Sequence, residues 1–141
     1  MSRLHHLDLV VSSVEESLAF YRDLLGPLGW TDLHEAVGER GEPIVYLLGE
    51  DVVPLLGLRQ RQADGDPPPH DRYELGIHHV AFTAPSRDAV DAAAERLRAR
   101  GARFDGEPGE RDYVPGYYAL FCFDPDGIKV EVVNIDPGAS E

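Results

Sequence analysis

The stretch LHHLDLVV at residues 4–11 is matched later in the chain by IHHVAFTA at residues 77–84. In both, an apolar residue precedes two histidines, and apolar side chains then recur at every second position. This period of two is typical of a β-strand that buries one face. The second histidine of each pair, His6 or His79, occupies the same place in the two strands. The chain therefore looks like a duplicated unit that keeps one imidazole at a matching position.

An amphipathic helix is expected after each of these strands. In SSVEESLAFYRDLLG, Ser12 or Ser13 provides an N-cap, acidic residues follow in the first turn, and apolar residues return with helical spacing. In PSRDAVDAAAERLRARGA, Ser86 provides the N-cap and Gly101 ends the helix. The order strand then helix is thus repeated as well.

Three further strands are expected after each helix, separated by turn-forming residues. In the first copy they cover about Trp30–Ala36, Ile44–Leu48 and Val52–Leu58. In the second copy they lie in RFDGEP, YYALFCFD and IKVEVVNI, and DPDG forms a tight hairpin turn between the last two. The order is β-α-β-β-β in each copy, which predicts an α+β fold.

The prolines, glycines and charges of RQRQADGDPPPHDRYELG break all periodicity, so this segment is expected to be an exposed linker. We expect residues 1–60 to form the first module, residues 61–75 the linker and residues 76–141 the second module. A module of this size buries little apolar surface alone, so we expect the two to share one core as a single compact domain.

The composition argues against some partners and compartments. The 26 acidic residues outnumber the 13 basic ones, and the formal net charge of -13 disfavours nucleic acid and anionic membranes as partners. No signal peptide is recognisable, and no stretch approaches the ~20 apolar residues of a membrane span. The one cysteine, Cys122, cannot form an internal disulfide, so we expect a cytoplasmic protein. Because Cys122 lies in an apolar strand, we expect its thiol to be packed and unreactive.

Strand parity places three possible metal ligands on equivalent faces. In each strand the apolar set must pack on the helix, so the alternate residues face the opposite side. This puts His6, His79 and Glu131 on the faces of their sheets that point away from the helices. Two imidazoles and one carboxylate form a known catalytic site for divalent metals. Hydrogen-bonded core histidines and a solvated strand glutamate are the alternative interpretation.

The chain resembles the vicinal oxygen chelate superfamily, also called the glyoxalase, bleomycin-resistance and dioxygenase superfamily, over nearly its whole length. The β-α-β-β-β duplication carries the resemblance, together with the motifs HHLDLVVSSVEESLAFYRDLLG, IHHVAF and GYYALFCFDPDGIKVEVV. It implies two modules that form a cup-shaped, eight-stranded mixed sheet around a divalent metal, with the helices outside. It also implies a homodimer.

In this superfamily the metal ligands come from the first and fourth strands of each module, so the resemblance implies metal binding by His6, His79 and Glu131. The fourth strand of the first module offers only Pro, Leu and Gly over Pro54–Leu58, unlike glyoxalase I and methylmalonyl-CoA epimerase. A three-ligand site is similar to those of extradiol dioxygenases and fosfomycin-resistance transferases, although other residues typical of those enzymes are missing here. The ligand types do not select among Fe, Mn, Ni, Zn and Co.

Several polar side chains are candidates to carry protons or to contact substrate at such a site. Tyr117 and Tyr118, in the PGYY segment, are the candidates for catalysis. The candidates for substrate contact are Asp8, Tyr46, Arg59 and Tyr113. Asp8 also shares the strand face of His6, where it would support a ligand, and Arg59 would suit an anionic group. Packing in the core or at the rim is the alternative for the tyrosines.

The sequence is consistent with two main classes of function. The first is a metal-dependent enzyme that acts on a small oxygen-bearing substrate chelated to the metal, with lyase, isomerase or dioxygenase chemistry. The second is a non-catalytic protein that binds an antibiotic or metabolite, as bleomycin-resistance proteins do on this fold. The apolar Pro54–Leu58 segment and the acidic charge favour this second class. A duplicated scaffold with vestigial ligands is a weaker third possibility.

Overall fold

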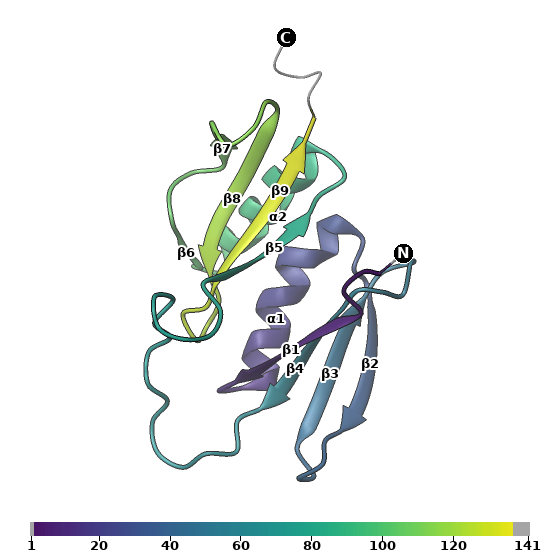
Figure 1. The fold of residues 1–141 in the computed structure, drawn as a ribbon, viewed down its shortest axis with the longest axis vertical. Coiled ribbons are helices and arrows are strands. Elements are labelled where there is room, and N and C mark those ends of the chain that lie inside the picture. Colours follow the sequence, from purple (N-terminus) through teal and green to yellow (C-terminus); the bar gives the residue numbers. More distant parts are fainter. Residues whose placement is uncertain (1, 137–141) are drawn as a thin grey trace. The chain divides into compact units, whose positions relative to one another are not determined.

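The computed structural model describes residues 2–136, which divide between Pro68 and Pro69 into two compact units. This division falls inside the segment expected to be the linker. Met1 and residues 137–141, at the outer ends of the two expected modules, lie outside the described residues. Each unit consists of one β-sheet with one long helix on it, and both follow the expected order of strand, helix and further strands (Figure 1).

The first unit is built on a four-stranded mixed sheet with the strand order β1-β4-β3-β2. β1 and β4 run parallel, whereas the other neighbours run antiparallel. The strands are β1 (His6–Val11), β2 (Asp32–Val37), β3 (Pro43–Leu48) and β4 (Leu55–Gln60).

Helix α1 (Val14–Leu25) covers one face of this sheet. Its N-cap is Ser13, one of the two predicted serines. The Ser13 hydroxyl accepts a hydrogen bond from the Glu16 amide at 3.2 Å, which satisfies one of the free N–H groups of the first turn. A short 3₁₀ helix, η1 (Gly26–Leu28), follows directly. On β1, Leu9 and Val11 are buried while Val10 is 60% exposed, so the predicted strand parity is correct.

The second unit is built on a five-stranded sheet in which β5, β9, β8 and β6 follow one another and β7 pairs with β8. Again the first and last strands of the unit, β5 and β9, run parallel. The strands are β5 (His79–Thr83), β6 (Arg103–Phe104), β7 (Gly109–Glu110), β8 (Tyr117–Phe123) and β9 (Lys129–Ile135).

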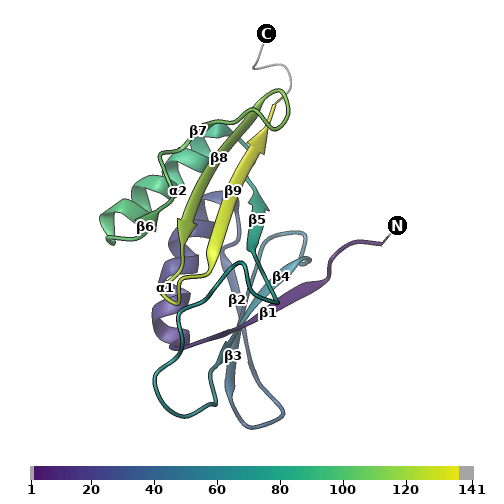
Figure 2. The same cartoon turned by 60° about the vertical axis from the view of Figure 1, so that its left-hand side comes forward.

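Helix α2 (Arg87–Ala99) runs along one face of this sheet (Figure 2). Ser86 caps it by accepting a hydrogen bond from the Ala89 amide at 3.1 Å, as predicted. Small residues on α2, including Ala93 and Ala94, let the helix lie close to the buried strand residues Val130 and Leu120. The apolar core of this unit therefore lies between α2 and the sheet.

The structure differs from the expected eight-stranded sheet within the described residues, where nine strands form one sheet of four and one of five. The difference arises in the second unit, because the segment between α2 and β8 forms two strands of two residues each, β6 and β7. Gly106, with a φ of 83°, interrupts the extended backbone between them. None of the described helices has the length and apolar character needed to cross a membrane.

Candidate functional site

His79 and Glu131 lie side by side in the second unit, on the sheet face opposite α2. Nε2 of His79 is 3.2 Å from Oε1 of Glu131. The glutamate side chain is 3% exposed and the histidine side chain 36%. The other glutamate oxygen, Oε2, accepts a hydrogen bond from the Tyr117 hydroxyl. A buried carboxylate is thus held from one side by a phenol and faces an accessible imidazole on the other.

The separation of these two atoms fits a shared divalent metal ion. Two donor atoms bound at about 2.0–2.2 Å to one tetrahedral or octahedral ion lie about 2.9–3.5 Å apart. Imidazole nitrogen and carboxylate oxygen are both ligands of Zn, Fe, Mn, Ni and Co. The distance between Nε2 and Oε1 falls inside this range, so the pair suits a metal without rearrangement. It equally permits a direct hydrogen bond between the two groups.

The surroundings of Glu131 are apolar and aromatic. Ala119, Phe121 and Val133 form a buried cluster on this face, with Tyr117 packed against it. The ring of Phe121 meets the His79 ring edge-on, with 6.4 Å between their centres. Burial and the hydrogen bond to Glu131 raise the pKa of Tyr117 to about 12, so the phenol stays protonated as a donor. Such a dry setting strengthens the charge interactions of the carboxylate.

In each unit the first histidine of the pair contacts the second and orients its ring. His5 Nδ1 lies 2.9 Å from His6 Nδ1, and His78 Nδ1 lies 2.8 Å from His79 Nδ1. In such a pair one Nδ1 donates and the other accepts. Where the second histidine donates, its Nε2 lone pair is free to bind a metal. The repeated double histidine therefore has a physical role in orienting the ring, which strand parity alone did not reveal.

The first unit presents a different arrangement around His6. Asp8, two residues along β1, accepts hydrogen bonds at Oδ2 from the Tyr46 hydroxyl at 3.0 Å and from Arg59 Nε at 2.7 Å. Nη1 of Arg59 also donates to Glu42 Oε1 at 2.9 Å. The hydrogen bond to Asp8 raises the pKa of Arg59, and burial followed by the Asp8 contact raises that of Tyr46. Arg59 is therefore held between two carboxylates.

The two units match in strand register. The first and last strands of each unit are parallel neighbours, and the register gives the corresponding pairs: His6–Leu55 and His79–Lys129, then Asp8–Gly57 and Ala81–Glu131. His6 therefore corresponds to His79, and Gly57 to Glu131. The carboxylate of the first unit comes instead from the neighbouring strand, at Asp8, where the second unit has Ala81.

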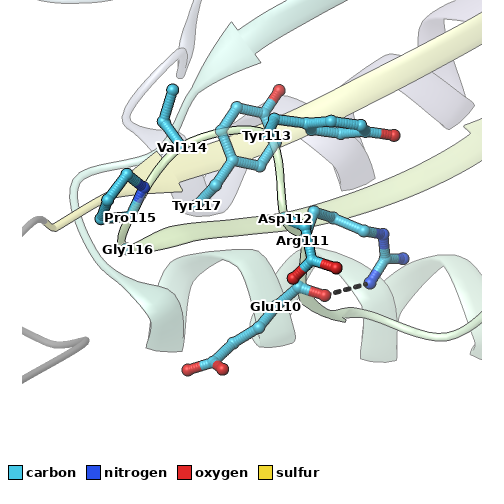
Figure 3. A pocket seen from close by; sticks show the side chains of 8 residues that line it. All are labelled: Glu110, Arg111, Asp112, Tyr113, Val114, Pro115, Gly116 and Tyr117. Carbon is cyan, nitrogen blue, oxygen red and sulfur yellow. Dashed lines mark hydrogen bonds between the residues drawn. The ribbon is translucent and has the colours of Figure 1, made fainter.

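A pocket of about 330 Å³ lies in the loop that leads into β8 (Figure 3). The rings of Tyr113 and Tyr117 meet edge-on in its wall, with 5.0 Å between their centres. Glu110, Arg111 and Asp112 add two acidic groups and one guanidinium to the lining. Tyr117 thus takes part in both the pocket wall and the hydrogen bond to Glu131.

The structure separates the two adjacent tyrosines that the sequence singled out. Tyr118 lies on the α2 side of the sheet, where its hydroxyl donates to Asp91 at 2.6 Å and its ring packs against Arg87. Only Tyr117 of the two contacts Glu131. Cys122 is fully buried, as predicted, and its burial raises the pKa of the thiol to about 12. Asp8, Tyr46 and Arg59 form one hydrogen-bonded group, which no pattern in the sequence predicted.

Over residues 2–136, no group of three or more His, Cys, Asp or Glu side chains is arranged to hold a metal ion. Each unit by itself supplies one imidazole and one carboxylate. In the first unit these are His6 and Asp8 on the same strand, and in the second unit they are His79 and Glu131 on neighbouring strands of the sheet. Sequence reasoning missed Glu42 and the roles of His5 and His78 as partners of the second histidines. The doubled histidines were the one available signal for the last two.

Comparison with known proteins places these features in a wider group. The family model of the Glyoxalase/Bleomycin resistance protein/Dioxygenase superfamily matches residues 3–132. An uncharacterized protein of Bacillus subtilis, YqjT, is 32% identical, over 92% of this chain and 97% of its own length. A solved structure from Bacillus halodurans has 33% identity and a TM-score of 0.68, covering 93% of this chain and 94% of that one. A glyoxylase/bleomycin resistance protein/dioxygenase domain from Frankia, 24% identical, has a TM-score of 0.77, covering 98% and 95%.

Proposed function

The chain belongs to the Glyoxalase/Bleomycin resistance protein/Dioxygenase superfamily, and on that premise we propose that it is a metal-dependent enzyme. Its substrate is a small oxygen-bearing molecule that chelates the metal. Members of this superfamily commonly use divalent metals, bind small molecules and often form dimers. The proposed protein ligands are His6, His79 and Glu131, and the metal is one of Fe, Mn, Ni, Zn and Co.

The observation that carries this proposal is the pair of His79 and Glu131. Their facing atoms are 3.2 Å apart, and the carboxylate is buried with a phenol on its far oxygen. A buried glutamate is expensive unless it is paired or binds a metal. His6 joins the set because it has the same register and the same histidine neighbour as His79.

The side chains have separable tasks in this proposal. A divalent metal supplies Lewis acidity toward the oxygens of a bound substrate. Tyr117 fixes Glu131 through Oε2 and so leaves Oε1 for the metal. The apolar cluster of Ala119, Phe121 and Val133 limits water on this face of the sheet. Tyr113, which is 66% exposed in the pocket wall, is proposed to contact substrate.

The test is turnover that depends on added metal. Demetallated protein is reloaded with each candidate ion and offered two substrates in separate assays. One is a catechol, with oxygen uptake as the readout, and the other is a thiohemiacetal of a 2-oxoaldehyde. The variant Glu131→Gln keeps the size of the side chain and removes its charge. The control is Glu35→Gln, an exposed glutamate of β2. Metal-dependent turnover in the control but not in Glu131→Gln supports the proposal, and equal turnover in both variants refutes the role of Glu131.

A second candidate function is the sequestration of a ligand without catalysis. The observation that favours it is the pocket beside Tyr113 and Tyr117, whose aromatic wall suits a molecule with flat rings. Its rim carries Glu110 and Asp112 together with Arg111. The test uses fully demetallated protein and bleomycin as the probe. Micromolar binding that is lost in Tyr113→Ala supports this function, while the absence of binding leaves the enzyme as the better account.

A further inference from the structure

Two phenylalanine rings of the second unit, Phe121 and Phe123, lie side by side on the sheet face opposite α2. On β8 they pair in register with Glu131 and Lys129 of β9, and directly opposed residues of an antiparallel pair share one face. We call these two rings the phenylalanine platform. It lies on the same face as the carboxylate of Glu131, and all of its residues belong to one unit.

Two arginines lie over the Phe123 ring of this platform. The guanidinium carbons of Arg103 and Arg72 are 4.1 and 5.7 Å from the ring centre. Within residues 2–136 neither guanidinium forms an ion pair, and Nε of Arg72 is buried without a hydrogen-bond partner. A contact with an aromatic ring attracts a cation but does not neutralise its charge. Both guanidinium groups therefore retain the capacity to bind an anion.

Two more cations lie over the neighbouring Phe121 ring. Nζ of Lys129 and the guanidinium carbon of Arg111 are 4.9 and 5.6 Å from its centre. The hydrogen bonds that Arg111 donates go to backbone carbonyl oxygens, which carry no net charge. Four positive charges are thus gathered on one platform, in a chain whose formal net charge is -13.

Asp105 supplies only part of the negative charge that these cations require. Its carboxylate accepts a hydrogen bond from Lys129 Nζ at 2.9 Å. This hydrogen bond and the charge of Lys129 lower the pKa of Asp105, and the charges of Arg72 and Arg111 lower it further. In the described part of the chain, Asp105 is the one carboxylate that forms an ion pair with any of the four cations. An additional anion would relieve their mutual repulsion.

The four cations lie next to the pair of His79 and Glu131. Lys129 pairs with His79 in register and precedes Glu131 by two residues on β9. Two residues of a strand span about 7 Å. A small molecule held at His79 and Glu131 therefore needs to extend only this far along β9 to reach Lys129.

We propose that the phenylalanine platform and its four cations bind an anionic group of the substrate, a carboxylate or a phosphate. The guanidinium groups of Arg72 and Arg103 donate hydrogen bonds to its oxygens, because their planar arrays of donors match both groups. Lys129 adds a positive charge on the side of His79. This inference rests on the proposed function, since it names the class of substrate for that site: an oxygen-bearing molecule that is also an anion.

The first experiment measures anion binding with inorganic phosphate and acetate as the probes, at an ionic strength held constant with sodium chloride. An anion that binds the native protein raises the midpoint of thermal unfolding with its concentration, which gives its affinity. The full chain is used as purified and again after treatment with EDTA, so that phosphate bound to a metal is recognised. The variants Arg72→Gln and Arg103→Gln each remove one positive charge without breaking an ion pair. Arg96→Gln, on the exposed side of α2, removes the same charge elsewhere and is the control.

We expect phosphate or acetate to bind wild type and Arg96→Gln with the same affinity. Each of Arg72→Gln and Arg103→Gln should bind it roughly tenfold more weakly, because one charge-assisted hydrogen bond is lost. The anion that binds more tightly identifies the group that the site recognises. Equal affinity in all four proteins, or no stabilisation by either anion, would overturn the inference.

A titration with Co²⁺ separates this inference from the proposed function. We expect Arg72→Gln to bind Co²⁺ as wild type does and His79→Ala to lose it. If wild type binds no Co²⁺, the proposed metal site is refuted, while a phosphate affinity that falls in Arg72→Gln still supports the anion site. If wild type binds Co²⁺ but neither anion, only the anion site is overturned.

Discussion

Tyr117 shows how one hydroxyl decides what a carboxylate is able to do. Its hydrogen bond satisfies one oxygen of Glu131 and leaves the other facing His79. Sequence parity placed Glu131 on the sheet face away from the helix, but no pattern in the sequence indicated that Tyr117 touches it. Tyr117 pairs with Ile135, four residues along β9 from Glu131, so the contact depends on side-chain reach and rotamer.

We predict that Tyr117→Phe weakens metal binding by about tenfold, because Glu131 loses the partner that orients it. The free energy of unfolding should fall by about 1–3 kcal/mol, since a buried oxygen is left unsatisfied. Titration with Co²⁺ and chemical denaturation measure the two effects. Tyr113→Phe keeps the hydrogen bond to Glu131 and is the control. Unchanged affinity in Tyr117→Phe would contradict the assigned role.

Cys122 gives a prediction about pH at the same scale. Burial raises the pKa of its thiol from 9.0 to about 12. The stability that comes from keeping the thiol neutral is complete below pH 9 and is lost as the pH rises from 9 toward 12. At pH 8 we therefore expect a thiol reagent to leave the native protein unmodified and to modify it once unfolded. Rapid modification of the native protein would show that the thiol is accessible.

At the scale of the elements, the sequence determined most of the fold. Of the two serines predicted as possible caps of the first helix, Ser13 is the N-cap, and Ser86 caps the second helix as predicted. The alternation on β1 and β5 correctly gave the faces of the sheets. The predicted turn lies between β8 and β9. There the Asp124 side chain accepts hydrogen bonds from the backbone amides of Asp126 and Ile128. Local capping and period are properties of short segments, so a single sequence reveals them.

The pairing between strands that are distant in sequence was harder to predict from the sequence. The equivalence of Gly57 with Glu131, and the closeness of Asp8, Tyr46 and Arg59, depend on the register of strands that are far apart in sequence. The interpretation of Arg59 as a binder of an anionic group arose from its type and place alone. In the structure its guanidinium contacts Asp8 and Glu42, contacts that no local pattern encodes.

The close approach of three strands at Gly57 leads to a stability prediction. A methyl group there would overlap Asp8 and press on Tyr46, so Gly57→Ala should lower the free energy of unfolding by about 1–3 kcal/mol. Gly109→Ala is the control, because its Cβ would meet only the flexible end of Arg111, at 3.3 Å. Chemical denaturation measures both variants. Equal stability of Gly57→Ala and wild type would mean that Asp8 does not occupy this space.

At the scale of the whole molecule, superfamily membership leads us to expect a homodimer. Light scattering on the purified protein should then report twice the 15.6 kDa mass of the chain. Because association depends on concentration, the measurement is repeated over a dilution series. A mass equal to that of one chain at every concentration would contradict the expectation.

The central claim is that the duplicated histidine strands serve one divalent metal ion. The most direct measurement is elemental analysis of protein purified without a chelator or a histidine tag, with His79→Ala beside it and His34→Ala as the control. We predict about one metal per chain in wild type and in His34→Ala, and its loss in His79→Ala. If wild type holds no metal even after incubation with Fe, Mn, Ni, Zn and Co, or if His79→Ala retains it, the claim is wrong.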